Sequence, residues 1–215
     1  MRIIVFGASG RLGRQVVRRA AEGGHSVTAF VRSPEKLDLD ALGLSAAARD
    51  AVVVRQGDAL DADAVAEAVI GHDAIISAVG GANGLRAGDD ISRMVGKMAD
   101  AALAAGVNRI VHCASAGVDG ELTGLIGRAV MWVLRHPLAD HRAALERIQA
   151  AGLDATIVRP MSLTDGDFAP DYVEVPAGPP ATSKAIPRAS VADAMVRALE
   201  QPDDYIGASV GLSLA

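Results

Sequence analysis

The chain has 215 residues, half of them apolar but only 3% aromatic, and its formal net charge at pH 7 is -5. This length and apolar content favour one compact domain over residues 1–215 and exclude a disordered chain. The acidic balance and the lack of a basic cluster argue against nucleic acid or an anionic membrane as partner, and no apolar stretch reaches the ~18 residues of a membrane span.

The first predicted elements are a strand and a helix joined by glycines. The apolar run Arg2–Phe6 stops at Gly7, which is typical of a strand buried on both faces. From Arg11 to Gly23 the apolar residues recur at helical spacing, and Gly23 and Gly24 provide the stop.

The same alternation continues along the chain. The pattern predicts strands over 26–31, 52–55, 74–79, 109–113 and 155–159, and helices over 61–70, 91–105 and 138–151. Such βα alternation implies an α/β fold with a Rossmann-like, doubly wound parallel sheet.

Beyond Pro160 the composition changes. Residues 161–189 are rich in Pro, Gly and Asp, and we interpret them as a small substrate-side loop region with one weak strand at 172–175. A helix over 190–199 is predicted to start at Ser190 as N-cap, with Asp193 as its acidic partner. A last strand is expected over 208–214.

A glycine pattern follows the first strand. Residues 7–13 spell GASGRLG, in which Gly7 permits a tight turn, Gly10 lets a pyrophosphate approach the backbone and Gly13 lets the helix lie close to the sheet. The free N–H groups at the helix start favour bound phosphate. A plain structural turn is the alternative. The predicted cofactor contacts in this loop are Gly7, Ser9, Gly10, Arg11, Leu12 and Gly13.

The end of the second predicted strand bears on the choice between NAD and NADP. An acidic residue there would accept from the ribose 2′-hydroxyl of NAD, but this chain has Arg32 followed by Ser33. A guanidinium binds phosphate well, so Arg32, with Ser33 and Arg11, favours NADP over NAD. The alternative is a solvated arginine with Ser33 capping the Pro34 turn.

Asp58 and Ala59 follow the third predicted strand. In the usual strand order they lie near the adenine edge, although Asp58 is also a typical turn residue. We leave both interpretations open.

These segments together resemble the short-chain dehydrogenase/reductase superfamily, in its atypical single-domain branch of NAD(P)H-binding proteins. The similarity extends through GASGRLG, Val31-Arg32, GDALDADAV from Gly57, DAIISAVGG from Asp73, GVNRIVHCASAG from Gly106 and AGLDATIVRP from Ala151. Within that branch the chain is similar to the flavin reductase/biliverdin-IXβ reductase group and to NmrA-like regulators.

The resemblance implies further contacts to the cofactor. Ala78, Val79 and Gly80 would line its ribose, and Ser115 would lie beside the nicotinamide. Pro160, Met161 and Ser162 would flank the carboxamide.

One departure from the superfamily concerns the YxxxK pair, which lowers the pKa of a tyrosine for proton transfer. In this chain the tyrosine position holds Pro137 and the lysine position holds His141. The flavin reductase-like group is similar, because it also lacks the tyrosine and has a histidine in this helix. Ser115 and His141 are therefore the candidate catalytic residues. The alternatives are a loop-capping serine and a structural histidine.

Other polar and aromatic residues receive weaker interpretations. Cys113 is the only cysteine, so an internal disulfide is excluded, no metal site is indicated and a reducing, cytoplasmic setting is expected. We interpret Cys113 and His112 as buried and structural. Phe168 and Tyr172 either stack on a flat substrate or anchor the loop region, and residues 122–134 form either a lid or a partner-facing helix.

Three functions compete. The leading hypothesis is an NADPH-dependent reductase that passes hydride to a small planar acceptor such as a flavin or quinone, acting as a monomer or homodimer. The second is a non-catalytic NADP(H) sensor of the NmrA-like type. The third, a nucleotide-sugar epimerase or dehydratase, is disfavoured by the missing tyrosine.

Overall fold

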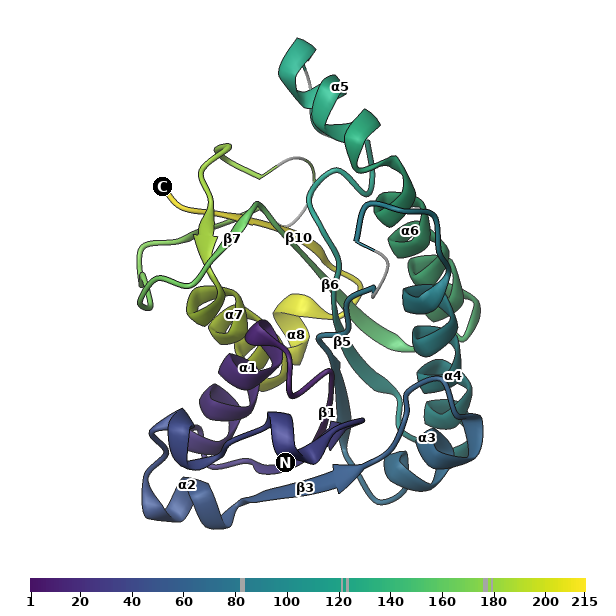
Figure 1. The fold of residues 1–215 in the computed structure, drawn as a ribbon, viewed down its shortest axis with the longest axis vertical. Coiled ribbons are helices and arrows are strands. Elements are labelled where there is room, and N and C mark those ends of the chain that lie inside the picture. The colour runs from purple at the N-terminus through teal and green to yellow at the C-terminus, as the bar shows by residue number, and fades with distance from the viewer. Residues whose placement is uncertain (82–83, 121, 123, 176–177, 179) are drawn as a thin grey trace.

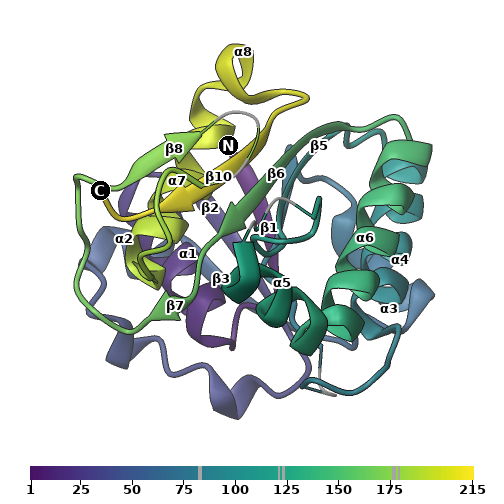
Figure 2. The same cartoon turned by 90° about the horizontal axis from the view of Figure 1, so that it is seen from above.

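A twisted, mainly parallel sheet forms the centre of the molecule, with helices on both faces (Figures 1 and 2). The computed structural model describes residues 1–81, 84–120, 122, 124–175, 178 and 180–215. Among these residues the main sheet has the order β3-β2-β1-β4-β5-β6-β10-β8, and a small second sheet pairs β7 with β9. The expected Rossmann-like α/β fold is confirmed.

The strands are as follows: β1 (Arg2–Phe6), β2 (Ser26–Val31), β3 (Val52–Gln56), β4 (Ala74–Ser77), β5 (Arg109–Cys113), β6 (Asp154–Pro160), β7 (Leu163–Thr164), β8 (Val173–Val175), β9 (Ile186–Pro187) and β10 (Ser209–Ser213). Neighbours from β3 to β10 run parallel. Only β8, at the edge, pairs antiparallel within this sheet.

Two separate hydrophobic cores hold the helices against the sheet. One core lies under α1 (Arg11–Glu22) and α7 (Arg188–Glu200). The other lies under α3 (Ala62–Val69), α4 (Asp90–Ala105) and α6 (Arg135–Ala150). The central strands β1 and β4 are apolar on both faces because each contributes side chains to both cores.

Shorter helices lie at the periphery. They are the 3-10 turns η1 (Pro34–Lys36) and η2 (Asp40–Leu42), and the helices α2 (Ala46–Asp50), α5 (Gly124–Val133) and α8 (Pro202–Tyr205). Figure 1 shows α5 projecting from the end of the molecule at which α6 begins.

The sequence placed most elements within a few residues of their observed bounds, with two corrections. Helix α6 begins at Arg135, three residues before the predicted start. Ser190 is not an N-cap, because α7 begins at Arg188 after Pro187. The Ser190 hydroxyl instead bonds the carbonyl and N–H of Ala169, a long-range contact that no local pattern reveals.

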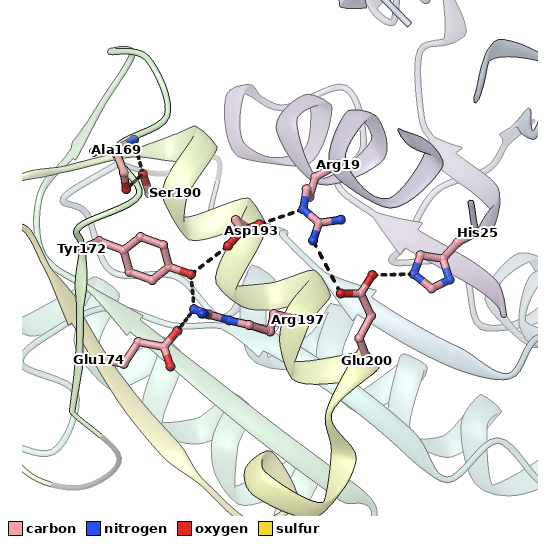
Figure 3. A network of polar contacts seen from close by, with 9 residues as sticks. All are labelled: Arg19, His25, Ala169, Tyr172, Glu174, Ser190, Asp193, Arg197 and Glu200. Carbon is pink, nitrogen blue, oxygen red and sulfur yellow. Dashed lines mark hydrogen bonds and ion pairs between the residues drawn. The ribbon is translucent and has the colours of Figure 1, made fainter. Parts of the chain in front are cut away.

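A chain of polar contacts ties the loop region and α1 to α7 (Figure 3). Asp193 of α7 accepts from Arg19 Nε at 2.7 Å with one oxygen and from the Tyr172 hydroxyl at 3.0 Å with the other. Glu200 contacts Arg19 and His25 at the far end of the helix. Residues 169–175 are thereby held against the rest of the fold.

Candidate functional site

The glycine loop is packed too closely for side chains at two positions. Gly7 has a φ of +78°, and a Cβ there would lie 2.6 Å from the Ala78 carbonyl oxygen. A Cβ on Gly13 would lie 2.1 Å from the carbonyl oxygen of Gly7. Both glycines are therefore required by the approach of the loop to the end of β4 and to the first turn of α1.

The N-terminus of α1 is open to an anion. Gly10 is the N-cap and has no side chain to satisfy the first N–H groups. Its own N–H donates to Gly7 O at 2.9 Å, and the first intrahelical bond runs from Arg14 N to Gly10 O. Because the helix dipole adds partial positive charge and the first turn holds no acidic residue, this cradle fits a pyrophosphate.

A groove runs from this loop along the carboxyl ends of β3, β2, β1 and β4. We call it the dinucleotide groove. Its volume is about 250 Å³, and its lining is Gly7, Ser9, Gly10, Phe30, Val31, Arg32, Gly57, Asp58, Ala59, Leu60, Ala78, Val79, Gly80, Asp90 and Met94. Nine of these residues are among the contacts predicted from the sequence.

The sequence missed six lining residues. One of them is Gly57, where an added Cβ would lie 2.4 Å from the Phe30 ring, so a larger residue would require the ring to shift. Asp90 and Met94 reach the groove from α4, which the glycine motif does not locate, while Phe30, Val31 and Leu60 line it from β2 and from the turn after β3.

Arg32 and Asp58 line the end of the groove that lies after β2 and β3. The Arg32 side chain is exposed and, among the described residues, has no ion pair. The Asp58 carboxylate accepts from Leu60 N at 2.9 Å, as a turn residue does, and Asp58 also lines the groove. The Ser33 side chain makes no capping hydrogen bond to the Pro34 turn, so that part of the alternative is wrong, whereas Arg32 is exposed as the alternative expects.

A second cavity, the β5–β6 pocket, opens at the ends of the next two strands. Its volume is about 290 Å³, and its lining is Ala114, Ser115, Ala116, Leu122, Val130, Leu134, Pro160, Met161, Ser162, Leu163 and Arg188. It brings together the four residues predicted on the nicotinamide side. Ala116 N donates to Pro160 O at 3.0 Å, so the backbone fixes the two strand ends together.

Ser115 is half-buried in this pocket. Its hydroxyl donates to the carbonyl of its neighbour Ala116 at 3.1 Å. A bond of this kind can be exchanged for one to a ligand by rotation about the Cβ–Oγ bond.

His141 lies in a different cavity from Ser115. It lines a space of about 100 Å³ between α4, α6 and the segment after β4, together with Pro137 and Asp140. The Asp140 carboxylate accepts from the N–H groups of Ile91 and Ser92, and so caps α4. The structure therefore places the two candidate catalytic side chains on separate surfaces.

The His141 ring neighbours a second buried imidazole. Its centroid is 5.9 Å from that of His112, whose Nδ1 lies 3.0 Å from Ser77 Oγ. Burial, with the neighbouring His141, lowers the pKa of His112 to about 3, and burial also lowers the pKa of His141. Both rings are thus neutral at pH 7, which weakens His141 as a proton donor.

The remaining predicted residues are accounted for individually. Leu12 and Gly13 are buried in the first turn of α1, and the exposed Arg11 side chain bonds Asp165 instead of lining the groove. Cys113 is buried, which raises the pKa of its thiol to about 12 and keeps it protonated. Phe168 is half-exposed and lines neither the dinucleotide groove nor the β5–β6 pocket, but a separate cavity of about 590 Å³ with Asp165 and Asp193.

Residues 122–134 partly serve as a wall. Val130 and Leu134 line the β5–β6 pocket. Leu125 and Trp132 of the same segment are 85% and 68% exposed. One side of this segment thus borders the pocket, while other apolar side chains face solvent.

In the described part of the chain, no helix combines the length and apolar character needed to cross a membrane. Nor do the described His, Cys, Asp and Glu side chains form any group of three or more that could hold a metal ion.

The comparisons with known proteins point to the same class of ligand as the geometry of the groove. A family model described as NAD(P)H-binding matches residues 7–202. The chain belongs to this NAD(P)H-binding family. A search of curated proteins found no match.

Three solved structures illustrate the shared fold. A short-chain dehydrogenase/reductase from Veillonella parvula, in complex with NADP, has a TM-score of 0.82 at 16% identity, covering 99% of this chain and 94% of that one. ChuY, an anaerobilin reductase from Escherichia coli O157:H7, has 0.78 at 23%, covering 99% and 97%. A Rossmann-fold NAD(P)-binding family protein from Shigella flexneri has 0.77 at 24%, covering 99% and 93%.

Proposed function

We propose that this protein is an NADPH-dependent reductase that passes hydride to a small, planar acceptor such as a flavin or a quinone. The observation that carries the proposal is the position of the two cavities. The dinucleotide groove ends at residues after β4, the β5–β6 pocket begins at residues after β5, and these strands are hydrogen-bonded neighbours. Parallel sheets bind ligands at this edge.

The cofactor preference rests on Arg32. Its unpaired guanidinium at the adenosine end of the groove suits a dianionic 2′-phosphate, which it can bind in bidentate fashion. The residue that would accept from an unmodified 2′-hydroxyl is absent from that place in the sequence. We therefore assign NADPH over NADH.

The protein's own contribution is positioning and exclusion of water. NADPH, when bound, supplies the hydride. Apolar residues such as Leu122 and Met161 keep water from the pocket, and the Ser115 hydroxyl is placed to hydrogen-bond an acceptor oxygen or the carboxamide. With proline and a neutral histidine at the YxxxK positions, acceptors that need no strong protein acid are favoured.

The test is NADPH oxidation by the purified protein against a panel of flavins, quinones and small carbonyl compounds, with NADH as comparison. We expect at least one flavin or quinone to accelerate oxidation, and NADPH to exceed NADH. If NADPH binds but no member of the panel accelerates its oxidation, the reductase proposal is wrong.

A non-catalytic NADP(H) sensor is the second candidate, and the exposed apolar residues of α5 favour it. Leu125, Trp132 and Val133 are 85%, 68% and 45% exposed, which is unusual for residues of this kind outside an interface. The sensor predicts tight cofactor binding without turnover. It also predicts that a partner retained with NADP⁺ is released with NADPH, which a pulldown under both conditions measures.

A further inference from the structure

The β5–β6 pocket has a single charged residue in its described lining. Its walls are mostly apolar, and its polar side chains are the hydroxyls of Ser115 and Ser162 and the guanidinium of Arg188. A pocket of this composition is complementary to a ligand with an apolar body and one anionic group.

Arg188 is held firmly at the pocket wall. It is the first residue of α7 and follows β9, whose Ile186 and Pro187 pair with β7. Its side chain is only 12% exposed. The stem of this side chain is therefore mostly packed against protein, and an anion beside its guanidinium forms a charge-assisted hydrogen bond.

The anion that compensates Arg188 within the protein is Asp165. Arg188 Nη1 donates to Asp165 Oδ1 at 2.6 Å, its one hydrogen bond to a described residue. A guanidinium carries five N–H donors. Each side-chain nitrogen of Arg188 either reaches solvent or has a hydrogen-bond partner. Donors therefore remain for a ligand in the pocket.

Asp165 itself is not confined in this way. Its side chain is 61% exposed, and its second oxygen accepts from Arg11 Nη1 at 2.9 Å, where Arg11 is 70% exposed. If Asp165 leaves Arg188, it keeps water and Arg11 as partners, and an exposed ion pair contributes little to stability. The asymmetry means that Arg188 stays at the pocket wall, whereas Asp165 can leave Arg188 and keep other partners.

We infer that Arg188 is the anion-binding residue of this pocket, that the acceptor carries a carboxylate, and that Asp165 holds the guanidinium until the acceptor replaces it. The exchange conserves charge, since one carboxylate is substituted for another on the same cation. This inference rests on the proposed function in taking the β5–β6 pocket as the acceptor site, and it makes Arg188 and Asp165 specificity-determining residues.

The experiment measures binding without turnover. Protein saturated with NADP⁺ is titrated calorimetrically with 2-naphthoate and with its neutral counterpart 2-naphthamide. We expect naphthoate to bind about tenfold more tightly, as one charge-assisted hydrogen bond predicts. Arg188→Gln should abolish this preference with amide affinity unchanged, Arg188→Lys should retain part of it, and Asp165→Asn should raise naphthoate affinity about threefold.

Arg49→Gln, which neutralises an exposed arginine of α2, is the matched control and should keep the preference. NADP⁺ affinity of each variant reports whether the fold is intact. Equal affinity of the wild type for both probes, or an equal loss of both in folded Arg188→Gln, would overturn the inference. No hydride moves in this binding assay. Failure to oxidise NADPH would therefore contradict only the proposed function. Turnover of neutral acceptors without a preference for a carboxylate would contradict only this inference.

Discussion

The dinucleotide groove consists largely of backbone and small side chains from β1 to β4, whereas the β5–β6 pocket is assembled from side chains of distant segments. In the groove, Gly7, Gly10 and Gly80 leave the main chain open to a ligand. In the pocket, Leu134 and Arg188 come from opposite sides of the sheet's carboxyl edge. Under the proposed function, the shape of the groove would accept the cofactor, and the side chains of the pocket would select the acceptor.

The largest effect is expected where the groove depends on the lack of a side chain. Gly7→Ala places a methyl group 2.6 Å from the Ala78 carbonyl oxygen at a φ of +78°. We expect a loss of about 3 kcal/mol in unfolding free energy and loss of NADPH binding. Denaturant unfolding and a fluorescence titration of NADPH measure the two effects.

Gly43→Ala is the matched control for this substitution. Gly43 also has positive φ, +63°, but its added Cβ would meet nothing within 4 Å. It should cost about 1 kcal/mol and leave NADPH affinity unchanged. Equal effects of the two substitutions would mean that backbone conformation, and not the close approach to β4, sets the requirement.

The next effect separates the two regions kinetically. Ser115→Ala removes the hydroxyl from the β5–β6 pocket and should lower kcat/KM about 30-fold, because one hydrogen bond to a reacting group is lost. NADPH affinity should change less than twofold. The exposed Ser183→Ala provides the control, and a parallel loss of cofactor affinity in Ser115→Ala would place this serine in the groove instead.

Arg32→Ala tests the groove's preference for phosphate. The affinity for NADPH should fall about tenfold, since a charge-assisted contact is removed, and that for NADH should stay within twofold. Arg49→Ala, which removes another exposed arginine, should alter neither. Similar losses for both cofactors would refute the contact with the 2′-phosphate.

The smallest expected effect concerns His112, which is buried beside His141. The folded pKa of His112, about 3, lies below its ordinary value of 6.5, so the unfolded chain binds more protons between these values and stability falls as pH decreases below 6.5. Between about pH 7.5 and about pH 6 the wild type should lose about 0.8 kcal/mol more unfolding free energy than His112→Asn does. Urea unfolding at both pH values measures it. An unchanged pH dependence would mean that folding does not lower the pKa of His112.

Much of the groove could be predicted because its signals are local. The GxxGxxG spacing directly after β1 fixes the loop, and Arg32 and Asp58 follow their strands immediately, so parallel topology brings them together. The central strands β1 and β4 are continuous buried apolar runs, which are easily located in the sequence. For the same reason most element bounds were found within a few residues.

The pocket's polar contacts had no such signal. Asp165 is 23 residues from Arg188 and 154 from Arg11, so no spacing rule connects the three. Ser190 looked like a helix cap because its hydroxyl is a good acceptor, but tertiary packing gives it to Ala169. His141 was correctly placed on a helix, yet the cavity it lines depends on how α6 packs against α4.

The most direct measurement of the central claim is the rate of NADPH oxidation with hydrogen or deuterium at the transferred position, with a flavin or quinone acceptor present. The account predicts faster oxidation with acceptor than without, a primary isotope effect, and a larger effect in Ser115→Ala if that variant slows the transfer itself. An acceptor-independent rate with no isotope effect would contradict it, because hydride would then not pass from the groove to a ligand in the β5–β6 pocket.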